Sequence, residues 1–160
     1  MAEVIVNTSP LQYLHQIGQL ELLPKLFGRI IVPEAVVAEL AAGRRLGVSL
    51  PIPEALGWID RRRPASLIGG LPAWDLGAGE SAVLSLGLEN PGSWVVLDDK
   101  LARQAAVHLQ IPLLGTAGIL LRAKRAGHLH AIRPVLNQLT ALGFRITSDT
   151  MRNILDLAGE

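Results

Sequence analysis

Short apolar runs alternate along the chain with longer segments that have helical periodicity. Five strands are predicted by runs rich in β-branched and other apolar residues, at positions 3–6, 29–32, 57–61, 93–97 and 111–115. Helices are predicted where apolar residues recur three or four positions apart, at 9–27, 33–43, 77–90, 99–109, 116–127, 132–143 and 148–158. The first of these segments is expected to form two short helices broken near Gly18. Apolar strands that alternate with helices are typical of a parallel sheet covered on both faces. The pattern therefore predicts an α/β fold.

Local signals predict where several of these elements begin and end. Ser9 and Pro10 are residue types preferred at an N-cap and at the first helical position, so the first helix is expected to begin there. Pro33 and Gly43 are expected to open and close the helix after the second strand. Ser148 is expected to cap the last helix.

The composition is that of an ordinary globular protein, with 49% hydrophobic and 18% charged residues. The length suits one domain with a substantial core, spanning residues 1–160. The absence of cysteine excludes disulfide bonds and cysteine-based zinc sites, and it fits a reducing cytoplasm. No run of about 18 apolar residues occurs and no basic segment opens the chain, so neither a membrane span nor a signal peptide is expected.

Basic residues gather in one part of the chain, although the net charge is only +1. Between residues 100 and 148 there is no acidic residue, whereas lysine and arginine recur. Two interpretations stay open: an ordinary solvated helix face, or a surface that binds the phosphates of a nucleic acid. The candidates for following an RNA backbone are Lys100, Arg103, Arg122, Lys124 and Arg125.

Several common catalytic motifs are missing from the sequence. No Gly-x-Gly-x-x-Gly follows the first strand, so a dinucleotide site is unsupported, and no Gly-x-Ser-x-Gly nucleophile elbow occurs. The glycine-rich stretch GAGES lacks the Lys-Ser/Thr pair of a P-loop. Asn7, at the end of the first strand, cannot act as an aspartyl nucleophile.

Polar residues stand instead at matching ends of the predicted elements. Asn7 ends the first strand, and Asp98 and Asp99 end the fourth. Glu80 begins one predicted helix, and Glu39 lies within another. Because parallel strands end at the same edge of a sheet, we expect these side chains to converge there. Oxygen ligands of this kind suit Mg²⁺ or Mn²⁺, which can activate water and neutralise the charge of a phosphodiester.

Each of these residues also has a purely structural interpretation. Glu80 would oppose a helix dipole, which is worth about 0.3–1 kcal/mol, and Glu39 would be a surface position. One of Asp98 and Asp99 is expected to cap the helix that follows, and Thr116 would cap another. The expected convergence of these residues, rather than any one of them, indicates a metal site.

Six stretches occur in an order that spans nearly the whole chain: VNTSPLQYL, IIVPEAVVAEL, LGAGESAVLSL, VVLDDKLARQAA, IPLLGTAGILLRAKRAG and LNQLTALGFRIT. This ordered set resembles the PIN domain, the metal-dependent nuclease fold shared by VapC-type toxins. The resemblance implies a three-layer α/β/α fold with a central parallel sheet. It also implies cleavage of single-stranded RNA with Mg²⁺ or Mn²⁺, and it makes an antitoxin protein a candidate partner.

The resemblance also carries over to individual residues. The implied metal positions are Asn7, Glu39, Glu80 and Asp99. Asp98, next to Asp99, is a further catalytic candidate. The polar positions that lie near the metal site of such domains match Thr8, Ser9 and Thr116.

Asn7 departs from the PIN pattern, which usually has aspartate at this position. An amide oxygen can still bind a hard cation, but it brings no negative charge. At about 4 Å and an effective dielectric of about 20, one missing charge is worth roughly 4 kcal/mol per unit of cation charge before compensation. Two alternatives are therefore expected: an active ribonuclease, or a weakened or inactive PIN-fold module that binds RNA or protein.

The last predicted helix carries an apolar stripe, formed by Met151, Ile154, Leu155 and Leu157. Such a stripe must be buried against another surface. We favour burial against the chain's own core, and a homodimer is the alternative.

Overall fold

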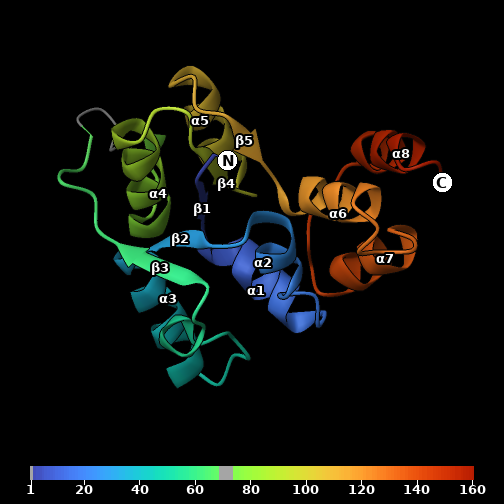
Figure 1. Cartoon of the computed structure of the whole chain (residues 1–160), viewed down its shortest axis with the longest axis horizontal. Coiled ribbons are helices and arrows are strands. Elements are labelled where there is room, and N and C mark those ends of the chain that lie inside the picture. Colours follow the sequence, from blue (N-terminus) through green and yellow to red (C-terminus); the bar gives the residue numbers. More distant parts are fainter. Residues whose placement is uncertain (1, 69–73) are drawn as a thin grey trace.

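The computed structural model describes residues 2–68 and 74–160, which form a sheet surrounded by helices (Figure 1). The strands are β1 (Val4–Val6), β2 (Ile30–Pro33), β3 (Ile59–Arg62), β4 (Trp94–Val96) and β5 (Leu113–Leu114). The helices are α1 (Thr8–Gln16), α2 (Leu22–Phe27), α3 (Glu34–Arg45), the short 3₁₀ turn η1 (Pro53–Ala55), α4 (Ala78–Glu89), α5 (Lys100–His108), α6 (Thr116–Arg125), α7 (Arg133–Ala141) and α8 (Ser148–Leu157). Within this described part of the chain, no helix combines the length and the apolar character needed to cross a bilayer.

The strands pair in parallel throughout the sheet, in the order β3-β2-β1-β4-β5. This confirms the predicted α/β class with a central parallel sheet of five strands. The chain builds outward from β1 through β2 to β3, and it then adds β4 and β5 on the other side of β1. The carboxyl ends of β1 and β4 therefore border the topological switch point, where open α/β sheets bind their ligands.

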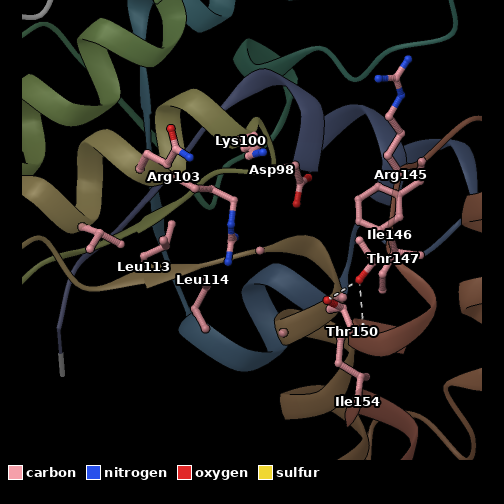
Figure 2. A pocket seen from close by; sticks show the side chains of 16 residues that line it. Asp98, Lys100, Arg103, Leu113, Leu114, Arg145, Ile146, Thr147, Thr150 and Ile154 are labelled. Carbon is pink, nitrogen blue, oxygen red and sulfur yellow. Dashed lines mark hydrogen bonds between the residues drawn. The ribbon is translucent and has the colours of Figure 1, made fainter. Parts of the chain in front are cut away.

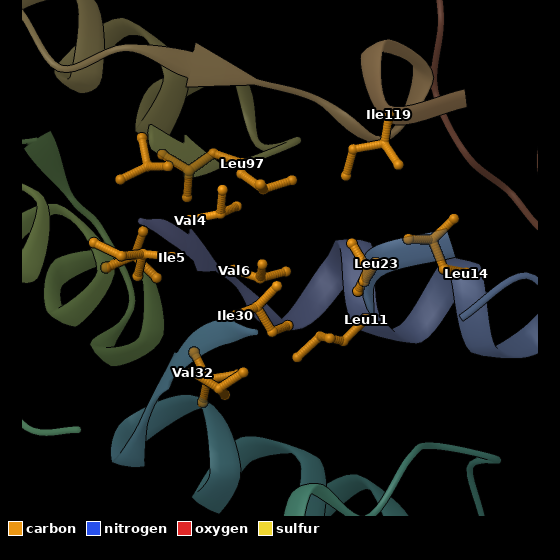
Figure 3. Packing of buried hydrophobic residues seen from close by; sticks show 14 of the residues in the cluster. Val4, Ile5, Val6, Leu11, Leu14, Leu23, Ile30, Val32, Leu97 and Ile119 are labelled. Carbon is orange, nitrogen blue, oxygen red and sulfur yellow. The ribbon is translucent and has the colours of Figure 1, made fainter. Parts of the chain in front are cut away.

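Helices cover both faces of the sheet, and every residue of β1 and β2 is buried. Figure 3 shows Ile5 beside α4, whereas Val6 and Ile30 lie on the side of Leu23 in α2. α4 contacts β1, β2 and β4 and packs against α3, while α1 and α2 pack against α6. Successive side chains of a strand are thus buried against opposite helical layers, which confirms the predicted three-layer architecture.

The predicted N-cap of the first helix is wrong. The helix α1 begins at Thr8 with Asn7 as its N-cap, and Ser9 lies within the first turn. Asn7 has an extended backbone (φ −82°, ψ 175°), so β1 passes into α1 without a linker. The side chain of Asn7 makes no capping hydrogen bond, which leaves it available at the end of β1.

Two other helix ends also differ from the prediction. The helix α3 continues past Gly43 to Arg45, and the Leu50 side chain fills the space that a Cβ at this glycine would occupy. The helix α8 is capped by Thr147 and not by Ser148. The Thr147 hydroxyl accepts a hydrogen bond from the Thr150 N–H at 3.1 Å.

The apolar stripe of α8 packs against the chain itself. Leu155 belongs to the buried core, and α8 contacts α6. Leu157 at the end of the stripe is 61% exposed. The stripe therefore helps to close the core, as favoured from the sequence, and a homodimer stays a prediction.

Glu160 ties the end of the chain to α6 and α7. Its carboxylate accepts hydrogen bonds from Lys124 Nζ at 2.9 Å and from the N–H groups of Ile132 and Arg133 at 2.7 and 3.1 Å. These donors, with the Ile132 N–H first and Lys124 second, lower the pKa of Glu160 from 4.5 to about 2. The ionised carboxylate therefore fastens α8 beside the start of α7.

Replacing Glu160 by glutamine is expected to lower the melting temperature at neutral pH. A lowered pKa means that the stability from the ionised group is present above pH 4.5 and is lost as the pH falls toward 2. The melting temperatures of wild type and Glu160→Gln should therefore converge with acidification, which circular dichroism can follow. The same change at the exposed Glu21 is the control. A difference at Glu160 that stays constant across this pH range would contradict the role assigned to its charge.

Candidate functional site

Asn7 and Asp98 follow neighbouring strands at the switch point of the sheet. Asn7 comes directly after β1, and its N–H donates to the Val96 carbonyl at the end of β4 (3.2 Å). Only Leu97 separates Asp98 from β4. The parallel register thus carries one amide and one carboxylate to adjoining strand ends.

The side chain of Asn7 contains an unpartnered polar atom. Asn7 is only 2% exposed, and its Oδ1 has no hydrogen-bond partner among the described residues. A buried acceptor without a partner is unfavourable by about 1–3 kcal/mol, and native proteins rarely keep one unless water or an ion satisfies it. This oxygen is therefore available to a water molecule or an ion at the end of β1.

Thr116, the first residue of α6, holds the carboxylate of Asp98. Its N–H donates to Oδ1 at 2.8 Å, and its Oγ1 donates to Oδ2 at 2.6 Å. Burial raises the pKa of Asp98 above its ordinary value of 3.8, although the Thr116 hydrogen bonds and the charge of Arg103 oppose the rise. Each oxygen keeps a further lone pair, and Figure 2 shows Asp98 at the edge of a cavity.

Gly115 gives Arg103 room to approach Asp98. The Nη1 of Arg103 donates to the Leu97 carbonyl at 2.8 Å. A Cβ at Gly115 would lie 2.7 Å from that nitrogen and 3.3 Å from Asp98 Oδ1. Glycine at this position therefore permits a guanidinium to lie beside the carboxylate.

The carboxylate of Glu39, a residue of α3, reaches the N-terminal end of α4, where Glu80 also lies. Glu39 Oε2 accepts from Thr8 Oγ1 at 2.5 Å, and its Oε1 accepts from the Gly79 N–H at 2.8 Å. A Cβ at Gly79 would lie 2.7 Å from Glu39 Oε1, so glycine leaves room for this carboxylate in its observed position. Glu80 stands in the first turn of α4, with its Oε2 2.7 Å from the position of a Cβ on Gly77. Glu39 thus joins α1, α3 and α4 rather than standing on an open surface.

The structure separates the roles of the two adjacent aspartates. Asp99 is the N-cap of α5, and its Oδ2 accepts from the Ala102 N–H at 3.0 Å. One oxygen of its carboxylate therefore caps the helix, as expected for one of the two aspartates, and the role of Asp99 as a metal ligand stays a prediction. Asp98 is the residue that lies with Thr116 at the strand ends.

The expected single cluster of carboxylates does not form. Across residues 2–68 and 74–160, no three Asp, Glu or His side chains are grouped so that they would hold one metal ion. The Glu39 carboxylate and Glu80 lie at the start of α4, whereas the Asp98 carboxylate is bonded to the start of α6. The polar side-chain atoms near the switch point are nevertheless oxygens, the ligands preferred by Mg²⁺ and Mn²⁺, and Asn7 Oδ1 is one that no other described residue bonds. This set fits such a cation in donor type and supplies less negative charge than expected.

The predicted RNA-binding cations divide into two groups. Lys100 and Arg103 belong to the first turn of α5 and line the cavity beside Asp98. These two residues are therefore placed to meet a phosphate near the candidate site.

The second group does not border the site. Its members occupy the last turn of α6, roughly 10 Å along the helix axis from its N-terminus: Arg122, Lys124 and Arg125. Lys124 pairs with Glu160, and the Arg122 guanidinium lies 5.2 Å from the ring centroid of Trp94. The α6 helix runs away from the carboxyl edge of the sheet, which explains why these cations are distant from Asp98.

Sequence reasoning missed two glycines and one segment that shape the site. Gly79 and Gly115 leave the space into which the ends of the Glu39 and Arg103 side chains reach. Their signal was their position in GAGES and LLGT, directly at helix starts where close approach is common. The segment 144–150, which closes the cavity beside Asp98, carried no comparable signal.

Comparison with known proteins identifies one family. A family model described as DUF3368: PIN domain matches residues 3–160. No curated protein and no solved structure matches the chain significantly. PIN domains are typically nucleases that use divalent metals, which agrees with an oxygen-rich site at the carboxyl edge of the sheet. With nearly its whole length matched, the chain belongs to the PIN-domain family.

Proposed function

We propose that this protein is a ribonuclease that cleaves single-stranded RNA with Mg²⁺ or Mn²⁺. One observation carries the proposal: at the switch point of a PIN fold, next to the strand that leads to Asp98, Asn7 Oδ1 is buried with no partner in the part of the chain that the structure describes. When bound, the cation would neutralise phosphate charge and lower the pKa of a water molecule. A role as the toxin of a toxin–antitoxin pair belongs to the same proposal.

Each residue of the site has a distinct task in this proposal. Asn7 and Asp98 would hold the cation, and Thr116 keeps Asp98 in position with its two hydrogen bonds. Glu39 and Glu80 would add negative charge, directly or through water. Lys100 and Arg103 would bind phosphates of the RNA on the neighbouring helix α5.

Asn7→Asp is expected to strengthen the binding of Mn²⁺ and to raise Mn²⁺-dependent cleavage. One added charge is worth roughly 4 kcal/mol per unit of cation charge. Even a third of this free energy would raise the affinity for Mn²⁺ about tenfold. The rise in melting temperature with added Mn²⁺ reports binding. Cleavage of an end-labelled single-stranded RNA reports activity.

Asn153→Asp is the matched control, because it makes the same charge change on the exposed surface of α8. It should leave both measurements near the wild-type values. In EDTA, Asn7→Asp should be less stable than wild type, because it buries a carboxylate without a cation. Equal responses of the two variants to Mn²⁺ would contradict a metal site at Asn7.

The second candidate function is a PIN-fold module that binds RNA or a protein such as an antitoxin without cleaving RNA. Asn7 in place of a carboxylate favours it, as does the lack of a three-residue metal group in the described parts of the chain. Cleavage by Asn7→Asp alone would identify a weakened enzyme. RNA binding without cleavage by any variant would favour the binding module.

A further inference from the structure

A cavity of about 790 Å³ lies beside Asp98, between α5, β5, the start of α6 and the segment 144–154 (Figure 2). Its volume is in the range of small-molecule and cofactor sites, about 300–1,000 Å³. Much of its wall is apolar, formed by Val107, Leu113, Leu114, Phe144, Ile146 and Ile154. The proposed reaction does not use this apolar wall.

The charges around the cavity favour an anionic ligand. Lys100, Arg103 and Arg145 line it, and Asp98 is the single acidic residue among the lining residues. Figure 2 shows Arg145 extending away from the apolar side chains, whereas Arg103 lies close to Leu114. A ligand with a flat apolar part and an attached anion would match this combination.

An aromatic ring at the cavity supports the same ligand. Phe144 lines the cavity, and Tyr13 packs against it in an edge-to-face arrangement with ring centroids 5.2 Å apart and an interplanar angle of 79°. This contact limits the motion of the Phe144 ring. Stacking of nucleobases on aromatic side chains is a general mode of single-strand recognition.

A peptide strand fits the cavity less well. The sheet edge that borders it, β5, is two residues long and follows Pro112, which has no N–H group. An added strand gains its affinity from a row of main-chain hydrogen bonds, and this edge offers too few. The cavity is therefore better suited to a nucleotide than to an extended polypeptide.

We propose that this cavity binds one nucleotide of a single-stranded RNA, with the base against Phe144 and the apolar wall and the phosphate near Lys100 and Arg103. The inference rests on the proposed function, because it takes RNA as the substrate. The cavity adjoins Asp98, so the bound nucleotide would lie next to the scissile phosphate. The shape of the cavity would then contribute to the base preference of the enzyme.

Gly118 offers a way to fill the cavity without harming the fold. It lines the cavity from α6, and a Cβ there would make an ordinary 3.5 Å contact with Leu114. Gly118→Leu would place a larger side chain in the cavity, whereas Gly118→Ala would leave most of it open. Both residues form helices better than glycine, so both variants should melt at or above the wild-type temperature.

The test measures binding in EDTA, where metal-dependent cleavage is blocked. The probes are a fluorescent single-stranded RNA hexamer and the same hexamer with an abasic ribose at each position in turn. We expect wild type and Gly118→Ala to lose affinity about fivefold or more when one particular base is missing, since stacked bases contribute that much or more. Gly118→Leu should bind the intact hexamer as weakly as wild type binds the abasic one, and it should no longer distinguish the two.

Phe144→Leu gives an independent reading, because it keeps an apolar side chain but removes the aromatic face. It should lower the affinity for the intact hexamer and leave the affinity for the abasic hexamer nearly unchanged. An unchanged affinity in both Gly118→Leu and Phe144→Leu would overturn the inference, as would equal losses at every abasic position. Base-dependent binding by a protein that cleaves nothing would support the nucleotide site while rejecting the ribonuclease, so the two failures are distinguishable.

Discussion

Replacing Asp98 by asparagine is expected to lower Mn²⁺-dependent cleavage of single-stranded RNA by at least about a hundredfold. Loss of a residue that only orients a metal ligand typically lowers affinity or activity about 10–100-fold, so loss of the ligand charge should reach or exceed the upper value. The variant keeps both hydrogen bonds to Thr116, because the asparagine amide can accept from the Thr116 N–H and donate to Thr116 Oγ1. The initial rate of cleavage of an end-labelled RNA at saturating Mn²⁺ measures the effect.

The same variant is expected to be more stable than wild type when metal is removed. Because burial raises the pKa of Asp98, ionisation destabilises the folded state as the pH rises from 3.8 through the raised value. In EDTA at neutral pH, Asp98→Asn should therefore melt at a higher temperature than wild type. The two melting temperatures should converge as the pH falls below 3.8. Lost cleavage with unchanged or increased stability would separate a catalytic role of Asp98 from a structural one.

Asp99→Asn is the matched control, since it changes the neighbouring residue in the same way. Asparagine is as good an N-cap as aspartate, so the start of α5 should be preserved and the melting temperature should change little. Cleavage should stay within a few-fold of wild type. If Asp99→Asn abolished cleavage and Asp98→Asn did not, the assignment of the two aspartates would have to be reversed.

Leu84→Ala is expected to lower the free energy of unfolding by about 2–5 kcal/mol. Leu84 is fully buried in α4, the helix that covers β1, β2 and β4, and truncation leaves a cavity that the packed layers can only partly fill. For a chain of this size the melting temperature should fall by roughly 4–20 °C. Urea unfolding followed by tryptophan fluorescence and by circular dichroism measures the change.

Leu88→Ala is the control on the same helix, one turn further along, where the leucine is 37% exposed. It should change the free energy of unfolding by less than about 1 kcal/mol, because folding removes less apolar surface of this leucine from water. At temperatures where the Leu84→Ala variant is folded, the cleavage activity of Leu84→Ala should resemble that of wild type. Similar losses of stability at both positions would show that Leu84 is not packed as the structure describes.

The sheet and most of its helices were predictable because their signals are local. Apolar runs and helical periodicity located the five strands and the helices between them, and their alternation predicted a parallel sheet. The errors fell at helix ends such as Ser9 and Ser148, where several adjacent residues are acceptable caps and the surrounding chain selects one. The resemblance to the PIN domain was confirmed over nearly the whole length.

The candidate site was predicted by residue type but not by arrangement. The sequence indicated polar residues at strand and helix ends, and the structure places Asn7 and Asp98 at the switch point. The sequence did not reveal that Glu39 would bond to Thr8 and Gly79, since these contacts join positions 31 and 40 residues apart. Nor did it separate Asp98 from Asp99, because the distinction depends on Thr116 from another part of the chain.

The sequence by itself determined the order of strands and helices, the residue types at the end of each strand and the family of the chain. These depend on hydrophobic periodicity and on ordered motifs, which neighbouring residues carry along the chain. Only the tertiary structure decided that Asp99 caps a helix while Asp98 is bonded to Thr116, and that a cavity opens beside Asp98. It also decided that Asn7 Oδ1 is buried with no partner among residues 2–68 and 74–160. The physical reason is that burial, hydrogen-bond partners and empty space arise from contacts between distant segments, which exist only once the layers have packed.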